Sequence, residues 1–525
     1  MAWFYAAAPL LPEILARHAR SRPTAPALVY GDVSLDWQAF DAALNRVANA
    51  LLDAGLRPGE RVAILMDNGV EMALTMFGTM RAGLVAVPLN TSVADDALAA
   101  MIDDCAARAL VVTAAHRARA DECLARGTHD LPCRVCAADT TGPAGGGDWL
   151  AWTAWLEAAD AAPPAVTVAD EDDCNIIYSS GTTSLPKGIV HTHRRRLDWA
   201  FDLAIALRYH ARAVTLCSLG LYSNISWVGL LCTWVAGGTV VVLPRFTPAS
   251  ALDAIARHRI THFSMVPVQY QRLLEDAAWS ARDLRSLEAV MCCGSPLPAM
   301  LKSQLLTGLG CRFIELYGLT EGVITTLDPE DADGRIASVG RALTGTEIRI
   351  VGDDDRECAT GEPGEIVGRG RILMSGYLNR DDASAEATWT DAQGQRWLRT
   401  GDIGRLDGDG FLYLVDRKKD MILSGGQNVY PADIEAVMLE HPAVAEVAVI
   451  GVPDARWGET PVAIVVARSV TDADGNTDAI RDWTNARVGR QQRIREVRFT
   501  EELPRNPNGK VLKRELRRTH AQMPH

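Results

Sequence analysis

The stretch that decides the fold is YSSGTTSLPKG, which runs from Tyr178 to Gly188 and follows directly on an apolar run that begins at Asn175. It combines hydroxyl side chains, glycines and one lysine. A polyphosphate needs these groups, because hydroxyls donate hydrogen bonds, glycines let backbone N–H groups approach closely, and a lysine supplies counter-charge. The stretch therefore predicts a phosphate-binding loop after a strand. A Ser/Thr/Gly-rich surface turn is the alternative that composition alone leaves open.

The position of the lysine sets this loop apart from the common nucleoside-triphosphatase loop. In that loop the lysine directly precedes a serine or threonine that binds magnesium. Here Lys187 precedes Gly188. A magnesium ligand is therefore expected elsewhere in the chain.

The composition is typical of a soluble globular protein with several cores. The chain has 525 residues, of which 48% are hydrophobic and 23% charged, and this length suggests two to four globular units. The net charge of -13 argues against a nucleic-acid scaffold, which usually carries a basic face. No nucleic-acid partner is expected.

The residues just after the phosphate loop are rich in histidine and arginine. Arg194, Arg195 and Arg196 are interpreted as the solvated start of a helix, because a short charge run usually forms a solvated face. His191 and His193 are interpreted as packing and hydrogen-bonding residues.

Several features of the sequence predict a cytoplasmic protein. The opening segment lacks a basic region before its apolar part, and its spacing of Leu11, Ile14 and Leu15 fits an amphipathic helix instead. We expect no transmembrane segment, since the best apolar candidate, residues 228–243, is interrupted by two glycines. Eleven cysteines without a framework spacing suit a reducing compartment, and Cys133 and Cys136 are interpreted as free thiols.

Alternating strand and helix patterns predict an α/β fold. Short β-rich runs at 61–66, 85–88 and 109–112 precede the loop, and similar runs at 213–219, 238–243, 261–266 and 287–292 follow it. Residues 338–414 change to short strands separated by Gly, Asp and Pro, as in a small β-barrel or meander. We therefore expect a large N-terminal domain, residues 1–418, with two doubly wound α/β subdomains and this small barrel. A smaller, mobile α+β domain, residues 419–525, is expected to follow.

Five motifs in one order resemble the adenylate-forming superfamily of acyl-CoA synthetases, firefly-type luciferases and peptide-synthetase adenylation domains. They are the loop from Tyr178 to Gly188, YGLTE from Tyr317 to Glu321, TGD from Thr400 to Asp402, DRKKDMILSGGQNVYP from Asp416 to Pro431, and PRNPNGKVLKREL from Pro504 to Leu516. The resemblance implies a two-step ligase. A carboxylate attacks the α-phosphate of Mg-ATP to give an acyl-adenylate, and the thiol of CoA then displaces AMP. ATP and CoA would be co-substrates and Mg²⁺ the cofactor.

The same resemblance implies roles for the motif residues. Ser179, Ser180, Gly181, Thr182, Thr183 and Lys187 would hold the β- and γ-phosphates. Thr320 would contact the α-phosphate, and Glu321 would bind Mg²⁺. Tyr317 would lie along the adenine. Asp402, assisted by Arg417, would accept the ribose hydroxyls, as suits an acceptor-only carboxylate.

The C-terminal motifs imply a moving catalytic lysine. Lys510 matches the lysine that bridges the substrate carboxylate and the α-phosphate, and Lys419 matches the hinge about which the C-terminal domain rotates between the two steps. This rotation would replace Lys510 by a CoA tunnel lined by Ser424, Gly425 and Gly426. Paired glycines suit a tunnel in which a pantetheine arm passes close to the backbone.

The sequence departs from the family pattern at the loop and around the acyl pocket. Ser184 replaces a usual glycine of the phosphate loop. The pocket candidates are uncharged, which favours a monocarboxylic acid with a fatty or aromatic body over a dicarboxylic acid. Ordinary core packing is the alternative for each candidate. The five candidates are Tyr222, Trp227, Cys293, Val323 and Ile324.

Two other functions share these motifs. An adenylating enzyme that loads a free-standing carrier protein would carry all of them. A catalytically inactive nucleotide-binding scaffold would have no chemical need for Lys510, Glu321 and Asp402 together. The sequence leaves a homodimer open.

Overall fold

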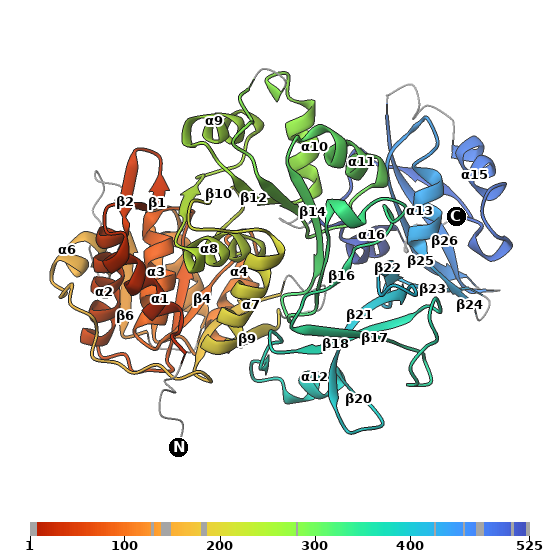
Figure 1. Ribbon diagram of the computed structural model, residues 1–525. Helices are drawn as coiled ribbons and strands as arrows, with labels where there is room; N and C mark the ends of the chain where they lie inside the picture. Colours follow the sequence, from red (N-terminus) through yellow and green to blue (C-terminus); the bar gives the residue numbers. More distant parts are fainter. Residues whose placement is uncertain are drawn as a thin grey trace. The chain divides into compact units, whose positions relative to one another are not determined.

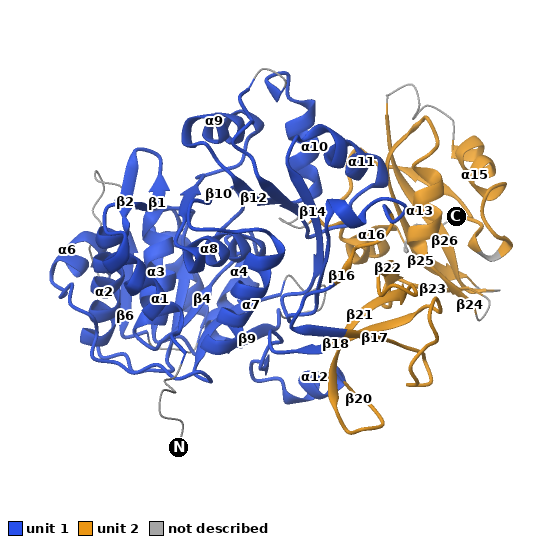
Figure 2. Ribbon diagram, viewed as in Figure 1, with its two compact units in different colours: residues 1–336, 342–347, 369–388 blue, residues 337–341, 348–368, 389–525 orange. Residues whose placement is uncertain are grey.

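The computed structural model describes residues 8–127, 131–137, 149–179, 186–279, 282–424, 427–454, 457–468, 477–505 and 509–520. The chain forms two compact units (Figure 2). Unit 1 comprises residues 1–336, 342–347 and 369–388, and unit 2 comprises residues 337–341, 348–368 and 389–525. The domain boundary expected between residues 418 and 419 stays a prediction.

The phosphate-loop strands belong to an eight-stranded sheet of unit 1, in the order β19-β9-β8-β4-β3-β5-β6-β7 (Figure 1). The strands from β8 to β7 pair in parallel, whereas β9 pairs antiparallel with β8 and with β19. The three strands predicted before the loop are confirmed as β3, β4 and β5. The bounds are β3 (Arg61–Leu65), β4 (Val85–Pro88), β5 (Ala109–Thr113), β6 (Cys133–Ala137), β7 (Leu150–Ala151), β8 (Asp173–Tyr178), β9 (Gly188–Thr192) and β19 (Gly376–Tyr377).

A nine-stranded sheet holds the strands predicted after the loop, in the order β16-β15-β14-β13-β12-β10-β11-β1-β2. Its centre, from β14 to β1, is parallel, and β15 returns antiparallel along β14. The YGLTE motif lies at this β14–β15 turn. The bounds are β1 (Pro26–Tyr30), β2 (Val33–Asp36), β10 (Val214–Cys217), β11 (Thr239–Val242), β12 (His262–Met265), β13 (Ala289–Cys292), β14 (Arg312–Gly318), β15 (Ile324–Leu327) and β16 (Arg341–Ala342).

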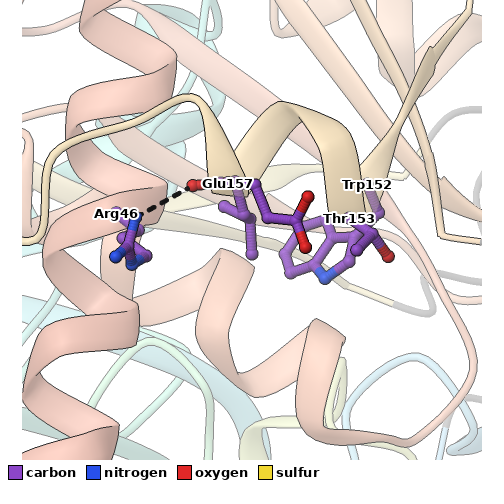
Figure 3. Close-up of a pocket in the computed structure, with 5 residues that line it drawn as sticks. Arg46, Trp152, Thr153 and Glu157 are labelled. Carbon is purple, nitrogen blue, oxygen red and sulfur yellow. Dashed lines mark hydrogen bonds between the residues drawn. The ribbon is translucent and has the colours of Figure 1, made fainter.

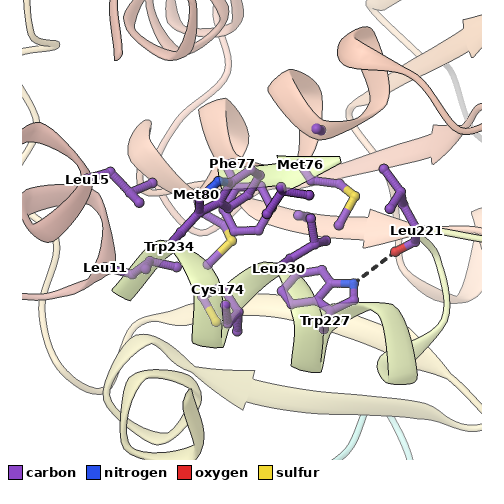
Figure 4. Close-up of a cluster of buried hydrophobic side chains, with 14 of the residues drawn as sticks. Leu11, Leu15, Met76, Phe77, Met80, Cys174, Leu221, Trp227, Leu230 and Trp234 are labelled. Atoms are coloured by element: carbon purple, nitrogen blue, oxygen red, sulfur yellow. Dashed lines mark hydrogen bonds between the residues drawn. The ribbon is translucent and has the colours of Figure 1, made fainter. Parts of the chain in front are cut away.

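Helices of unit 1 pack on these sheets, and one hydrophobic cluster takes side chains from both sheets and from α1, α2, α3, α7 and α8. Every residue of α8 from Ser226 to Val235 is buried, as expected of a helix that is apolar all round. Trp227 and Trp234 of α8 contact Phe77 of α3 (Figure 4). The bounds are α1 (Leu11–Ser21), α2 (Trp37–Asp53), α3 (Val70–Arg81), α4 (Asp95–Asp104), η1 (Ala114–His116), α5 (Arg117–Arg126), α6 (Trp152–Glu157), α7 (His193–Ala206), α8 (Asn224–Ala236), α9 (Pro248–His258), α10 (Pro267–Glu275), α11 (Ala299–Gly308), η3 (Pro329–Asp331) and α12 (Asp381–Glu386).

Unit 2 contains the predicted small β unit and the α+β tail. The β unit has the strand order β17-β18-β21-β20, with β22 also on β21, and the tail has the order β24-β23-β26-β25, with β27 on β26. The bounds are β17 (Thr346–Val351), β18 (Gly364–Gly370), β20 (Thr388–Thr390), β21 (Arg396–Leu406), β22 (Leu412–Arg417), β23 (Ile422–Ser424), β24 (Gln427–Val429), α13 (Pro431–Met438), β25 (Val444–Asp454), β26 (Gly458–Ala467), α15 (Thr477–Asn485), η4 (Arg490–Gln492), β27 (Val497–Phe499) and α16 (Lys513–His520).

The interpretation of the three arginines as a solvated face is wrong for Arg196. The run does begin a helix, α7, but Arg196 is only 1% exposed, whereas Arg194 and Arg195 are partly exposed. The helical period explains the difference, because position 196 shares the inner face of α7 with Trp199 and Ala200, both of which are buried.

The cysteines are all free, and nine of the eleven are buried. Cys133 and Cys136 are two of the buried thiols on β6. Burial raises the pKa of both thiols, so that each is held in its neutral form. None of the helices in the described ranges is both long and apolar enough to cross a membrane.

A buried ion pair anchors the strand that leads to the YGLTE turn. Lys302 of α11 pairs with Glu315 of β14, and the two side chains are only 3% and 10% exposed. Replacing Lys302 by methionine leaves a buried carboxylate without its ammonium partner. We expect the free energy of unfolding to fall by about 3–5 kcal/mol, measured by denaturant titration. The double variant Lys302→Met/Glu315→Leu removes both charges and should recover most of the loss; a single variant as stable as the native protein would contradict this.

Candidate active site

The two ends of the predicted phosphate loop are held together by the β8–β9 pair. Tyr178 lies opposite Gly188 in the antiparallel register, and the N–H of Ser179 donates to the carbonyl of Lys187 at 2.9 Å. The two ends of the loop, at Ser179 and Lys187, are therefore held close together. The remaining predicted loop residues lie outside the described residues, namely Ser180, Gly181, Thr182 and Thr183, together with Ser184.

Tyr377 of β19 joins the lysine of this loop to the predicted magnesium ligand. The Lys187 ammonium lies 4.6 Å from the centre of the Tyr377 ring, and the Tyr377 hydroxyl donates to Oε1 of Glu321 at 3.0 Å. Burial and the Glu321 carboxylate raise the pKa of Tyr377, which keeps its hydroxyl protonated as a donor. The sequence analysis missed Tyr377, because nothing in the local sequence relates it to residues so distant along the chain.

The β14–β15 turn presents Thr320 and Glu321. Gly322 has a φ of +113°, and a Cβ atom there would collide with the carbonyl oxygen of Ile372, so only glycine fits. The N–H of Met374 also donates to the carbonyl of Glu321 at 2.8 Å. The segment around residues 372–374 thus fixes the turn from outside. Tyr317 is partly buried near the end of β14.

Replacing Tyr377 by phenylalanine should separate the two contacts of this tyrosine. The ring remains for Lys187, but the hydrogen bond to Glu321 is lost, and such a bond to a charged group is worth about 1.5–3 kcal/mol. We expect roughly a tenfold rise in the Mg²⁺ concentration needed for half-maximal activity, with protein stability little changed. Titration of activity with Mg²⁺ measures this. Tyr413→Phe, which removes a hydroxyl that donates to Asp407 in unit 2, is the control; an equal shift there would contradict the assignment.

The predicted acyl-pocket residues gather around one core. Trp227, Cys293 and Ile324 belong to the same buried cluster, and Tyr222 packs against it. Val323 is fully buried beside Ile324. The indole N–H of Trp227 donates to the carbonyl of Leu221 at 3.1 Å. Whether these side chains line an acyl pocket stays a prediction.

In unit 2, Asp402 and Arg417 face each other across β21 and β22. They are paired in register, and Nε of Arg417 lies 3.1 Å from Oδ1 of Asp402. Asp402 is buried. A carboxylate held in this way by a guanidinium keeps acceptor positions aligned for a pair of hydroxyl groups, as predicted for a ribose.

Lys510 belongs to the same part of unit 2. Burial, with the cations Arg417 and Lys419, lowers the pKa of Lys510 to about 7, while Asp402 and Asp420 act in the opposite sense. The predicted catalytic lysine therefore shares an electrostatic environment with the predicted ribose-binding pair. Gly509, with a φ of +79°, and the hydrogen bond from Arg505 to its carbonyl at 2.6 Å set the backbone before Lys510.

The lowered pKa of Lys510 predicts a pH-dependent effect on stability. An unfolded lysine titrates near pH 10.4, so between about pH 7 and 10 the unfolded chain binds more protons and the native protein gains stability as the pH rises. The cost of burying this ammonium is therefore largest below about pH 7. Lys510→Met should raise the melting temperature most near pH 6 and hardly at all near pH 10. Exposed Lys418, replaced by methionine, is the control, and a gain independent of pH would contradict the prediction.

The remaining predicted residues of unit 2 lie on either side of β23. Lys419 lies in the turn before β23. Partial burial of its ammonium lowers the pKa of Lys419. Ser424 is buried at the end of β23, where it pairs in register with Gln427 of β24. Gly425 and Gly426 lie outside the described residues.

A separate pocket of about 350 Å³ lies on α2 and α6 (Figure 3). Its lining includes Arg46, whose guanidinium donates to the carbonyl of Ala159 at 2.5 Å. None of the predicted site residues that the structure describes lines it. The lining residues are Arg46, Trp152, Thr153, Leu156 and Glu157.

Comparison with known proteins identifies the family. The model of the AMP-binding enzyme family matches residues 15–378, and the model of the AMP-binding enzyme C-terminal domain matches residues 433–510. The chain belongs to the AMP-binding enzyme family. The segment 379–432, which neither model covers, contains the predicted domain boundary.

Individual AMP-binding enzymes match the chain over nearly its whole length. A feruloyl-CoA synthase of Amycolatopsis sp is 36% identical, covering 96% of this chain and 97% of its own. A long-chain-fatty-acid–CoA ligase of Mycobacterium tuberculosis is 34% identical, covering 93% and 94%. The crystal structure of ATP-bound MatB from Rhodopseudomonas palustris is similar with a TM-score of 0.87 at 27% identity, covering 97% of this chain and 99% of that one. The predicted adenylate-forming ligase of acyl-CoA synthetase type and its α/β fold are thereby confirmed.

Proposed function

We propose that this AMP-binding enzyme activates a monocarboxylic acid with an aromatic or fatty body as its acyl-adenylate and transfers the acyl group to CoA. The observation that carries the proposal is the environment of Lys510. Its partly buried ammonium interacts electrostatically with the Asp402–Arg417 pair. A partly buried lysine near a ribose-binding carboxylate is suited to an anionic nucleotide. Burial of an ammonium with a lowered pKa is typical of a functional site.

In the first step, a carboxylate oxygen of the acid attacks the α-phosphorus of ATP and pyrophosphate leaves with the electron pair. Asp402 holds the ribose, and Lys510 places its positive charge between the acid carboxylate and the α-phosphate. Charge held in place in this way stabilises the transition state without reorganisation. Lys187 and the loop hydroxyls hold the leaving pyrophosphate. Tyr317 and Thr320 position the adenine and the α-phosphate.

Magnesium fits the residues present around Glu321. Mg²⁺ in phosphate-transferring sites is usually bound by one or two carboxylates and by substrate phosphates. Glu321 supplies such a carboxylate, and Tyr377 orients it. When bound, the ion would neutralise charge on the phosphates.

In the second step, the sulfur of CoA attacks the acyl carbon, its proton passes to solvent, and AMP leaves. This step has no need of Lys510. We propose that rotation about Lys419 removes Lys510 and brings the hairpin from Ser424 to Gly426 to the reacting thiol. The domain boundary at 418 and 419 follows from this proposal.

The acid class rests on the candidate pocket and on relatives. The pocket candidates are apolar or aromatic, and the similar proteins described above include a feruloyl-CoA synthase and a long-chain-fatty-acid–CoA ligase. We also propose a cytoplasmic location, which the eleven free thiols support. A homodimer stays a prediction.

The deciding experiment measures pyrophosphate, AMP and acyl-CoA formed from Mg-ATP with short, medium, long-chain and aromatic acids, each with and without CoA. Acid-dependent pyrophosphate together with acyl-CoA supports the proposal and names the acid class. Pyrophosphate and acyl-AMP without acyl-CoA would instead favour a carrier protein as acceptor. ATP binding without any product would favour an inactive scaffold.

A further inference from the structure

A buried arginine of unit 1 has only neutral hydrogen-bond partners in the described part of the chain. Arg196 of α7 donates from Nε to Oδ1 of Asn175 at 3.0 Å and from Nη1 to Oδ1 of Asn224 at 3.1 Å. Its Nη2 lies 3.1 Å from Nδ1 of His191. Burial and the neighbouring arginine lower the pKa of His191 well below its usual value, so this imidazole is neutral and accepts. Among the described residues, the hydrogen-bond partners of the Arg196 charge are therefore neutral polar groups.

Two indole rings fix the plane of this guanidinium. Its central carbon lies 4.9 Å from the centre of the Trp199 ring and 5.1 Å from that of Trp227. Such cation–π contacts stabilise a desolvated cation but supply no hydrogen-bond acceptor. Burial lowers the pKa of Arg196 to about 10, and it remains charged at neutral pH.

The surroundings of Arg196 carry a surplus of donors. A guanidinium has five N–H bonds, and the contacts above use one on each nitrogen, which leaves one on each terminal nitrogen. The side-chain nitrogens Nδ2 of Asn175 and Nε1 of Trp199 are also buried without a partner among the described residues. Every one of these unused groups is a donor. A buried charge and unpaired donors are costly, so the complementary group is an acceptor.

Arg196 and its unused hydrogen-bond donors lie near residues that are predicted to line the acyl pocket. Asn224 and Trp227 lie one turn apart on α8, and Asn224 is two residues after Tyr222. Trp227 and Tyr222 are both predicted to line the acyl pocket. Arg196 contacts both Asn224 and Trp227, so it lies beside the helix that carries Trp227 and follows Tyr222.

We propose that Arg196 determines acid specificity by binding an oxygen acceptor, such as a phenol or keto oxygen, at the far end of the acid. This inference rests on the proposed function and narrows its substrate class. The five predicted pocket residues are uncharged, and Arg196 was not among them because its run was interpreted as a solvated helix start. With Arg196 buried, a purely apolar acid leaves the donors unpaired, whereas an acid with a distal oxygen pairs them.

The test compares acids that differ only by one distal oxygen. Suitable pairs are cinnamic and 4-hydroxycinnamic acid, benzoic and 4-hydroxybenzoic acid, and octanoic and 7-oxo-octanoic acid. For the full-length native enzyme, kcat/KM for acyl-CoA formation should be roughly 10- to 100-fold higher for the oxygenated member of at least one pair, the range expected for a hydrogen bond to a charged group. Most of the difference should appear in KM, since the contact is made in both ground and transition states.

Two variants and a control locate the source of the preference. Arg196→Met removes the charge and the donors at similar length, and it should reduce the preference to within about threefold while the apolar acid keeps its activity. Arg196→Lys keeps a charge and should retain part of the preference. Arg194→Met, on the same helix but paired with Asp170 at the surface, should leave the preference unchanged. Melting temperatures of all variants show whether each is folded.

The outcomes separate this inference from the proposed function. Turnover of several acids with no preference for any oxygenated member overturns the inference alone, even if Arg196→Met fails to fold. Equal loss of activity toward both members of a pair in a folded Arg196→Met also overturns it, because a structural or water-binding role has that effect. No turnover with any acid would overturn the proposed function, and this inference with it.

Discussion

Replacing Lys510 by alanine lowers acid-dependent release of pyrophosphate by roughly 10²- to 10³-fold, the usual loss for one preorganised charge at a reacting centre. The ammonium is partly buried and lies in the electrostatic field of Asp402 and Arg417 in unit 2. The rate of pyrophosphate release with the preferred acid measures the effect. KM for ATP should change far less than kcat, because the contact strengthens only in the transition state.

The second half-reaction provides the internal control for Lys510→Ala. Given prepared acyl-adenylate and CoA, the variant should form acyl-CoA within a few-fold of the native rate, since the thiol attack does not use this lysine. Lys418→Ala removes an exposed lysine of the same unit, paired with Glu365 at 3.0 Å, and should leave both steps intact. Equal loss in both half-reactions would show that Lys510 is needed for folding or for both orientations.

Replacing Glu321 by glutamine lowers kcat/KM for Mg-ATP by roughly 10²-fold, because a neutral amide is a poor ligand for a hard divalent cation. The amide oxygen can still accept from Tyr377, so the turn that Gly322 and Met374 hold should keep its shape. Higher Mg²⁺ should restore part of the activity, and this titration distinguishes a lost ligand from a lost fold.

A second acidic residue of unit 1, Glu330 in η3 after β15, serves as the matched control. Glu330→Gln changes an exposed carboxylate that pairs with Arg312 and should leave the Mg²⁺ dependence unaltered. If Glu321→Gln showed native Mg²⁺ dependence, the metal would have to be assigned to other residues, and the phosphate loop outside the described residues would be the next place to search.

Much of the fold could be predicted because buried parallel strands appear in the sequence as short apolar runs. Residues 85–88 and 109–112 are recognisable as strands for this reason. The segment before α2 shows the limit of local patterns. Residues 33–36 form β2, which pairs with β1, because pairing with another strand decides the structure of this short segment.

The site was predictable where its residues sit in contiguous motifs and not where folding assembles them. Asp402 and Arg417 belong to two motifs, and the register of β21 and β22 brings them together. Tyr377 reaches Glu321 only through the tertiary fold, and its own surroundings resemble any strand end. Arg196 was misjudged for a similar reason. A charge run suggests solvent, but the helical period directs one of three consecutive side chains inward.

The distribution of the free thiols makes the two units distinguishable to a chemical label. All cysteines but Cys358 lie in unit 1, and residues 389–525 contain none. The nine buried thiols all lie in unit 1, and a thiol reagent reaches them only when that unit opens, so their labelling rate reports its opening, apart from the partly exposed Cys311 and Cys358. A single cysteine introduced on the surface of the C-terminal segment would then carry a fluorescent dye with little competing background. Such a labelled chain would report the proposed rotation of the C-terminal segment.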